Sequence, residues 1–357
     1  MGDAPSSEHV PLFYIITYPR TCSNLLVRIL ALDEQPNVFP APDNGGYFFM
    51  PSFRMSIFER LATKHVDQLS EEEATKMKQA SQSCADNLGQ HVAQARSLHK
   101  RVVVKEHATL MNNPVQVTKF LYGPESTTQQ LWTVDPGPAA FGEKLVGDQT
   151  SPHSPGNDTI LPDRFLKAWK PTFLIRHPVA TFPSFYRAVK DLIGGDGPGE
   201  DVHKMLLTFH WNRSLYDWYA RQFANAAGAR NGDVQRDENA AWPIIIDADD
   251  IMTEPGMLVR YSEILGLDPT MLRFSWDQDT KEQTESRSPE EQRMLSTLLA
   301  SSGIDKSKLS KGLSIETEAA KWREEFGEEQ GAMVEKLVRD AMPDYEYMKS
   351  KRLRPAP

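Results

Sequence analysis

Cysteine is scarce in this chain of 357 residues, which contains only Cys22 and Cys84. Two thiols give no disulfide framework, and this scarcity indicates a reducing, intracellular compartment. A Cys–His zinc cluster is excluded as well, because the two cysteines have no paired histidines at the spacing that zinc ligands require. We therefore expect an intracellular protein with no metal site.

Long apolar runs and an excess of positive charge are also missing. No segment approaches the ~20 apolar residues that a transmembrane helix needs, and residues 1–8 are polar, with no signal-peptide core. The formal net charge is −9, whereas general nucleic-acid binders carry a basic excess. These absences predict a cytoplasmic protein with no membrane or nucleic-acid partner. A few local cations still suffice to bind a phosphate on an acidic protein.

Short apolar runs are present at wide intervals and predict buried strands at 12–17, 102–104, 172–175 and 243–246. Helical patterns lie between these runs, which is typical of α/β proteins with a mostly parallel sheet. We expect one long helix over 70–99, because Ser70 and the acidic residues after it form a helix start. A second helix is predicted over 205–223, and we interpret its aromatic stripe as core packing rather than ligand stacking.

The length allows one large domain with a substantial core, and we predict a single domain over 1–357 without internal repeats. Residues 1–10 are expected to form a flexible tail. Residues 147–162 are rich in Pro, Gly, Ser and Asp and are predicted to form a mobile loop. A highly charged stretch then indicates an exposed link into a helical C-terminal part over 280–357.

The most informative segment combines an apolar run at 12–16, a polar turn at 17–23 and a helical repeat of Leu and Ile at 24–32. A strand, a turn and a helix in this order direct backbone N–H groups and a positive dipole end at a bound phosphate. Arg20 is the only cation of the turn. The turn lacks the glycines that usually allow close phosphate approach, and it lacks the Gly-Lys-Ser/Thr of Walker-type ATPases. A solvated surface turn is the simpler alternative.

Polar residues also follow the second and third predicted strands. Lys105 and His107 face the same side if the strand continues, and they offer a candidate base and a cation for developing negative charge. A satisfied structural histidine is the alternative. Arg176 ends the third strand, and Ser184 follows inside a helix, where both side chains would flank one phosphate. Because ligands of parallel sheets bind beyond the carboxyl ends of the strands, we expect the three segments to converge.

In this order the three segments resemble the PAPS-dependent sulfotransferases, where PAPS is 3′-phosphoadenosine 5′-phosphosulfate. Tyr18-Pro19-Arg20-Thr21-Cys22-Ser23-Asn24-Leu25 is similar to the family's phosphosulfate-binding loop, Tyr-Pro-Lys-Ser-Gly-Thr-Thr-Trp. Lys105-Glu106-His107 is similar to its Lys-x-His element, and Arg176-His177-Pro178 with Ser184 to its 3′-phosphate element. Weaker similarity continues at 246–255, at Lys311-Gly312 and at 322–326, so the resemblance covers most of the chain except 40–100 and 125–165.

The resemblance implies a three-layer α/β fold with a central, mostly parallel sheet, as in P-loop NTPase-like proteins. It also implies transfer of a sulfonate group from PAPS to a hydroxyl or amine of a small-molecule acceptor, without a metal. His107 would be the general base, Lys105 would hold the sulfonate oxygens, and Arg20 would neutralise charge on the leaving phosphate. The implied PAPS contacts are Arg20, Thr21, Cys22, Ser23, Asn24, Arg176, Ser184, Lys311 and Gly312. Family members are often dimers, so a homodimer is a further implied expectation.

Besides Arg20 in place of Lys, which other family branches also use, three departures from the family pattern point to a divergent branch, of the kind found in fungal metabolism. Cys22 replaces the loop glycine, Leu25 stands at the adenine-stacking Trp of cytosolic members, and Ala248 stands at an adenine-contacting Tyr. Two alternatives follow. One is an enzyme of this fold that no longer uses PAPS and performs proton transfer, cyclisation or bond cleavage on a small metabolite. The other is a non-catalytic nucleotide-binding relative.

Overall fold

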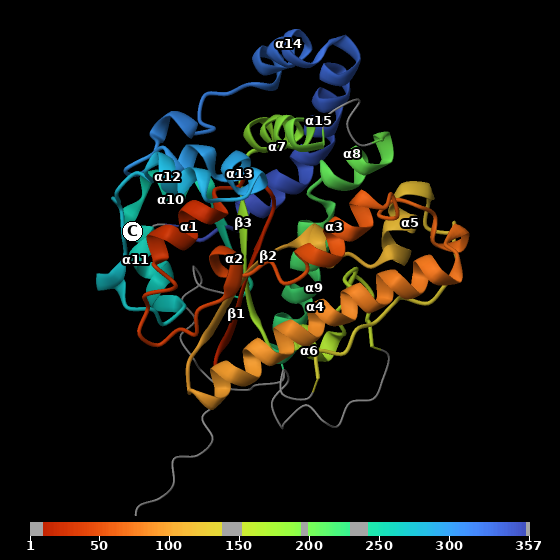
Figure 1. Cartoon of the computed structure of the whole chain (residues 1–357), viewed down its shortest axis with the longest axis horizontal. Helices are drawn as coiled ribbons and strands as arrows, with labels where there is room; N and C mark the ends of the chain where they lie inside the picture. The colour runs from red at the N-terminus through yellow and green to blue at the C-terminus, as the bar shows by residue number, and fades with distance from the viewer. Residues whose placement is uncertain (1–9, 138–151, 194–198, 229–241, 355–357) are drawn as a thin grey trace, which may run out of the picture. The chain divides into compact units, whose positions relative to one another are not determined.

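The computed structural model describes residues 10–137, 152–193, 199–228 and 242–354, which Figure 1 shows in colour. Most of the predicted tail over 1–10 and the first five residues of the predicted loop over 147–162 therefore lie outside the described residues. Two compact units make up the chain. The first consists of Met1–Ile16, Leu32–Thr172 and Ser214–Val234, and the second of Thr17–Ala31, Phe173–Arg213 and Gln235–Pro357.

Four strands form a parallel sheet in the order β2-β1-β3-β4, which confirms the predicted α/β class. Their bounds are Leu12–Thr17 (β1), Val102–His107 (β2), Lys170–Ile175 (β3) and Ile244–Asp247 (β4). Every residue of these strands except Lys170 is buried, which explains why they read as apolar runs rather than alternating ones. The predicted end of the second strand at Val104 is wrong, because β2 continues through the polar residues to His107.

The first unit contains the long helix that the sequence predicts. Helix α4 (Glu71–Ser97) starts with a capping box, in which Ser70 Oγ accepts the Glu73 N–H at 3.1 Å and the Glu73 carboxylate accepts the Ser70 N–H at 2.8 Å. Helix α3 packs beside it (Figure 1). The other elements here are α2 (Pro42–Gly45), α3 (Met50–Phe58), α5 (Pro114–Tyr122), α6 (Asp163–Lys167) and the 3₁₀ turns Val66–Gln68 and Ala108–Met111.

The single helix predicted over 205–223 is wrong, because two helices span this region. Helix α8 (Glu200–Leu206) ends at Leu206, and the backbone of its C-cap residue, Leu207, leaves the helical conformation. Helix α9 (His210–Gly228) begins three residues after Leu207. The interruption brings Phe209 into the core, where its ring lies 5.5 Å from that of Phe182. The core interpretation of the aromatic stripe is confirmed: Phe209, Trp211, Tyr216, Trp218 and Tyr219 are all buried.

The remaining helices belong to the second unit, where α14 and α15 lie side by side (Figure 1). They are α1 (Ser23–Leu30), α7 (Pro178–Ile193), α10 (Ala248–Thr253), α11 (Pro255–Ile264), α12 (Lys281–Glu285), α13 (Pro289–Leu299), α14 (Ile315–Phe326) and α15 (Glu328–Ser350), with 3₁₀ turns at Pro269–Met271 and Lys306–Lys308. Among the described residues, no helix combines the length and the hydropathy that a bilayer crossing requires.

The close approach of α14 and α15 depends on Gly331. A Cβ atom added there would lie 2.6 Å from the Arg323 Cα, so we expect Gly331→Ala to lower the free energy of unfolding by about 1–3 kcal/mol through overpacking. Gly256→Ala in α11 is the matched control, because nothing lies within 4 Å of its added Cβ. Denaturant unfolding of both variants checks the prediction, and equal stabilities would contradict it.

Candidate active site

The turn after β1 is fixed by its first residue, Tyr18. The Tyr18 hydroxyl donates to the Leu206 carbonyl at 2.9 Å, and its ring packs 5.2 Å from the ring of Phe182 and 5.1 Å from that of Phe209. The Thr21 hydroxyl donates back to the Tyr18 carbonyl at 2.6 Å. The aromatic core of the second unit therefore anchors the turn on which Arg20 is placed.

Two non-glycine residues of the turn adopt the left-handed backbone conformation. Arg20 has a φ of 66° and Cys22 a φ of 65°, and this conformation costs an L-residue about 1–2 kcal/mol. Cys22 stands where the resembled loop has glycine, so the chain keeps the backbone conformation without the glycine that favours it. Such strain is characteristic of functional turns that the surrounding structure holds in place.

Arg20 and Ser184 meet, although 164 residues separate them in the sequence. The Arg20 Nε donates to Ser184 Oγ at 2.9 Å, and its Nη1 donates to the Met294 carbonyl at 2.6 Å. Ser184 lies in α7 and Met294 in α13. The half-buried guanidinium is thereby held by two elements of the second unit.

Arg176 joins the same cluster from the end of β3. Its Nη1 donates to the Arg20 carbonyl at 3.0 Å, and its Nη2 donates to the Lys308 carbonyl. The next residue, His177, accepts the Val179 N–H on Nδ1 at 3.2 Å. His177 thus caps the start of α7 as an Asn or Asp side chain would, which accounts for its place in an Arg-(Asn/Asp)-Pro pattern.

The cluster carries positive charge that the described residues do not neutralise. Neither Arg20 nor Arg176 forms an ion pair with an acidic residue in the described ranges. Burial, together with the charges of Arg293 and Arg176, lowers the pKa of Arg20. Nine buried side-chain atoms have no hydrogen-bond partner among the described residues, and two of them are Arg176 Nε and Ser310 Oγ. A bound anion would offset this charge and could accept the Arg176 Nε–H.

Helix α1 begins beside this cluster in the sequence. Its N-cap residue, Cys22, forms no side-chain capping bond, and its first turn contains no acidic residue. Thr21 and Ser23 are buried, whereas Cys22 and Asn24 are half-buried. The positive end of the helix dipole is therefore not countered by an acidic residue of its own first turn.

The other predicted PAPS contacts, Lys311 and Gly312, follow Lys308, whose carbonyl accepts from Arg176. Lys311 and Gly312 are exposed, and no described residue makes a hydrogen bond or ion pair with the Lys311 side chain. Ser310, just before them, was missed by the sequence analysis. Its N–H donates to the Asp249 carboxylate at 2.9 Å, which holds the segment while the buried hydroxyl stays unpaired.

Lys105 and His107 belong to the first unit and lie within β2. Strand geometry continues to His107, so both side chains share one face, and both are buried. The Tyr47 ring contacts them: the Lys105 Nζ lies 4.3 Å from its centroid, and the His107 ring 4.7 Å. Burial, with the Lys105 charge, lowers the pKa of His107 to about 3. The imidazole is therefore neutral at physiological pH, and both burial and the Lys105 charge disfavour its protonated form.

Glu106, between these two residues, points to the opposite face and was also missed. Its carboxylate accepts the Phe49 N–H at 3.1 Å and the His107 N–H at 3.3 Å. Burial raises the pKa of Glu106 to about 8, against those hydrogen bonds and the Lys105 charge, which lower it. A single strand segment thus combines a neutral histidine with a carboxyl group that is mostly protonated at pH 7.

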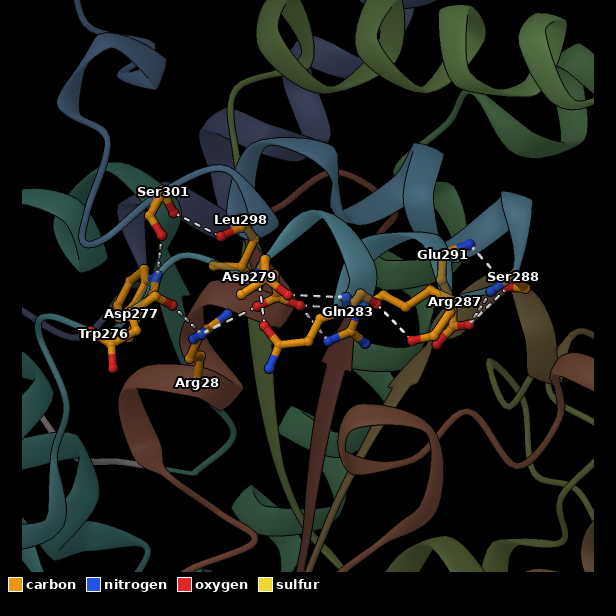
Figure 2. A network of polar contacts seen from close by, with 12 residues as sticks. Arg28, Trp276, Asp277, Asp279, Gln283, Arg287, Ser288, Glu291, Leu298 and Ser301 are labelled. Atoms are coloured by element: carbon orange, nitrogen blue, oxygen red, sulfur yellow. Dashed lines mark hydrogen bonds and ion pairs between the residues drawn. The ribbon is translucent and has the colours of Figure 1, made fainter.

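A separate polar network links α1 to the segment before α13 (Figure 2). The Arg28 guanidinium stacks 5.0 Å from the Trp276 ring, and Arg287 Nη2 pairs with the Asp279 carboxylate at 2.7 Å. A pocket of about 410 Å³ adjoins it, lined by Arg28, Arg273, Ser275, Trp276, Asp277, Gln278, Asp279 and Gln283. No local pattern predicts this network, because Arg28 lies 249 positions before Asp277 in the sequence.

These features define an α/β protein with a cationic, partly strained strand–turn–helix unit. Its family follows from comparison with known proteins. The chain is 40% identical over 343 residues to the sulfotransferase ppzF of Metarhizium rileyi, and 39% identical over 344 residues to that of Metarhizium majus. Each alignment covers 96% of both chains. The chain therefore belongs to the sulfotransferase family and is a sulfotransferase or sulfotransferase-like enzyme.

Two further comparisons do not contribute to the family assignment. No protein-family model matches the chain. The sulfotransferase domain of the Synechococcus PCC 7002 olefin synthase is 13% identical and covers 91% of this chain and 97% of its own, with a TM-score of 0.36. A score that low supports no structural inference, so the family assignment rests on the two fungal relatives.

The raised pKa of Glu106 predicts a pH-dependent stability. The folded state holds the proton more tightly than an unfolded carboxyl with its ordinary pKa of 4.5, so this stabilisation is complete below pH 4.5 and is lost as pH rises through 8. We expect the unfolding free energy of the wild type to fall relative to Glu106→Gln by about 1.4 kcal/mol per pH unit across this window.

Denaturant unfolding of both proteins between pH 5 and pH 9 measures this difference. The amide of Glu106→Gln keeps an oxygen that accepts the Phe49 N–H. Glu324→Gln, which changes an exposed carboxyl of α14, is the control and should follow the wild type at every pH. A difference between the wild type and Glu106→Gln that does not vary with pH would contradict the prediction.

Proposed function

We propose that the chain transfers a sulfonate group from PAPS to a hydroxyl or amine of a small-molecule acceptor. Two independent lines support this proposal. The fungal relatives that cover 96% of the chain are named sulfotransferases. The second unit holds a cluster of guanidinium groups that lack acidic partners among the described residues, with a buried Arg176 Nε that has no hydrogen-bond acceptor.

The unpaired cationic cluster is the observation that carries the proposal. A doubly phosphorylated nucleotide supplies the negative charge that it lacks. Arg176 and Ser184 would bind the 3′-phosphate, with Ser310 Oγ as an additional donor. Backbone N–H groups at Thr21–Asn24 would bind the 5′-phosphate at the start of α1, and Lys311 and Gly312 would contribute from the exposed segment after Ser310.

The transfer step moves one group and one proton. The acceptor oxygen or nitrogen attacks the sulfur of PAPS, a new bond to sulfur forms, and the bond from sulfur to the phosphate oxygen breaks. His107 takes the acceptor's proton as general base, and Lys105 holds the sulfonate oxygens. Arg20 stabilises the charge on the departing 3′-phosphoadenosine 5′-phosphate by electrostatics only, since a guanidinium does not deprotonate in proteins. Charge stabilisation of this kind dominates related phosphoryl transfers.

A second candidate is an enzyme of this family that no longer uses PAPS. Two positions that hold adenine-contacting rings in the resembled family lack them here: Leu25 is a half-buried aliphatic residue on α1, and Ala248 is fully buried at the start of α10. In this case Lys105 and His107 would perform proton transfer, cyclisation or bond cleavage on a small metabolite without a sulfonate donor.

Binding of 3′-phosphoadenosine 5′-phosphate separates the two candidates. At a hundredfold excess over its dissociation constant, the bisphosphate should stabilise the wild type by about 2.7 kcal/mol. We expect Arg176→Ala to weaken this binding at least tenfold, because a charge-assisted hydrogen bond contributes roughly 1.5–3 kcal/mol. Arg260→Ala removes an equal charge from the surface of α11 and should bind normally. Thermal unfolding with increasing bisphosphate is the measurement, and the absence of any shift would favour the PAPS-independent enzyme.

The role of His107 is tested separately from nucleotide binding. His107→Gln should keep the thermal shift with the bisphosphate but lose sulfonation of hydroxyl and amine acceptors by roughly 10²–10⁴-fold, as expected for a general base. Radiolabelled PAPS with a panel of phenols, alcohols and amines measures this loss. Full turnover by His107→Gln would refute the assignment, and wild-type binding without any turnover would favour the non-catalytic relative.

A further inference from the structure

Tyr47 makes two ring contacts with the catalytic pair proposed above. The Lys105 ammonium lies 4.3 Å from the ring centroid, within the range of a cation–π interaction. The His107 imidazole lies 4.7 Å from the same centroid at an interplanar angle of 49°. One half-buried aromatic ring thus contacts both functional side chains of β2 within the first unit.

The backbone before Tyr47 is fixed against β2. Gly46 forms a parallel bridge with Lys105, and the Tyr47 N–H donates to the Lys105 carbonyl at 2.9 Å. A Cβ atom at Gly46 would lie 2.1 Å from that carbonyl oxygen, so only glycine permits this approach. Tyr47 itself has a φ of 63°, a left-handed conformation that a bulky residue rarely adopts.

The backbone after Tyr47 is fixed as well. The Phe49 N–H donates to the Glu106 carboxylate at 3.1 Å, and the Met50 N–H donates to the Tyr47 carbonyl at 3.0 Å. Glu106 therefore holds Phe49, the N-cap residue of α3, against β2. The strand that carries the candidate base also sets the position of the ring that contacts it.

We propose that Tyr47 is a positioning residue of this enzyme, whose ring holds the Lys105 ammonium and the His107 imidazole in the orientation that catalysis requires. We assign this role to the aromatic ring of Tyr47, because both contacts are made to the ring. In its catalytic part this inference rests on the proposed function, because Tyr47 acts through Lys105 and His107 and not on the substrate. The ring contacts with Lys105 and His107 belong to the free protein and do not depend on the proposed function.

The ring also bears on the protonation of His107. Three charged or titratable residues with a recorded interaction at His107 are Lys105 on the same face of β2, Glu106 on the opposite face and Tyr47 before α3. Burial is the main cause of the lowered pKa of His107, followed by the Lys105 charge. Removing the ring admits water to the imidazole, so the pKa of His107 should rise toward its ordinary value of 6.5.

Two Tyr47 variants separate the ring from the hydroxyl. Tyr47→Phe keeps the ring, and Tyr47→Met replaces it with a flexible side chain. We expect Tyr47→Phe to retain kcat within about threefold of the wild type. Tyr47→Met should lose at least tenfold in kcat, because small displacements of catalytic groups reduce rates steeply. Its affinity for the bisphosphate should stay unchanged. Tyr122→Leu is the control, since it removes a ring that packs on a different histidine, His65, at 5.3 Å.

Titration of ¹⁵N-labelled histidine by NMR, with His107→Gln to assign the signal, tests the inference without turnover. The pKa of His107 should rise by at least one unit in Tyr47→Met and remain unchanged in Tyr47→Phe and Tyr122→Leu. If Tyr47→Met does not fold, Tyr47→Leu takes its place. An unchanged His107 titration in the ring-free variant would overturn the proposal, and so would an equal loss of kcat in Tyr47→Phe. Failure of the proposed function would show instead as no bisphosphate binding by the wild type.

Discussion

Two guanidinium groups without an acidic partner among the described residues, those of Arg20 and Arg176, set the main electrostatic constraint on the second unit. Each donates to neutral oxygens only: Arg20 to Ser184 Oγ and the Met294 carbonyl, Arg176 to the carbonyls of Arg20 and Lys308. Neutral acceptors orient a guanidinium but do not neutralise it. Placing two such groups together, one of them buried, costs free energy that a bound anion recovers.

In the first unit, strand β2 contains three buried titratable residues, Lys105, Glu106 and His107. Burial disfavours the charged form of two of them: it keeps His107 neutral and raises the pKa of Glu106 to about 8. The remaining ammonium, Lys105, lies against the face of the Tyr47 ring. In the proposed transfer, Lys105 would face the negative charge that develops on the transferred group, and the neutral His107 would take the acceptor's proton.

The sequence predicted what local pattern controls, and missed what distant contacts control. Apolar runs gave the strands, and Ser70 with Glu73 gave the start of α4, since these signals lie within a few residues. The end of β2 was placed too early because Lys105, Glu106 and His107 are polar, and their contacts with the distant Gly46–Phe49 segment leave no local signal. The Arg20–Ser184 hydrogen bond joins positions 164 residues apart, and Arg20 and Cys22 adopt left-handed conformations that composition disfavours. Nothing local marked Ser310, Tyr47 or Trp276.

The central claim is that the cluster around Arg176 binds the 3′-phosphate of an adenosine bisphosphate. Calorimetric titration of the wild type with 3′-phosphoadenosine 5′-phosphate and with adenosine 5′-monophosphate tests it most directly, because the two ligands differ only in that phosphate. The account predicts at least hundredfold tighter binding of the bisphosphate, a difference of about 2.7 kcal/mol. Equal affinity for the two nucleotides would contradict it.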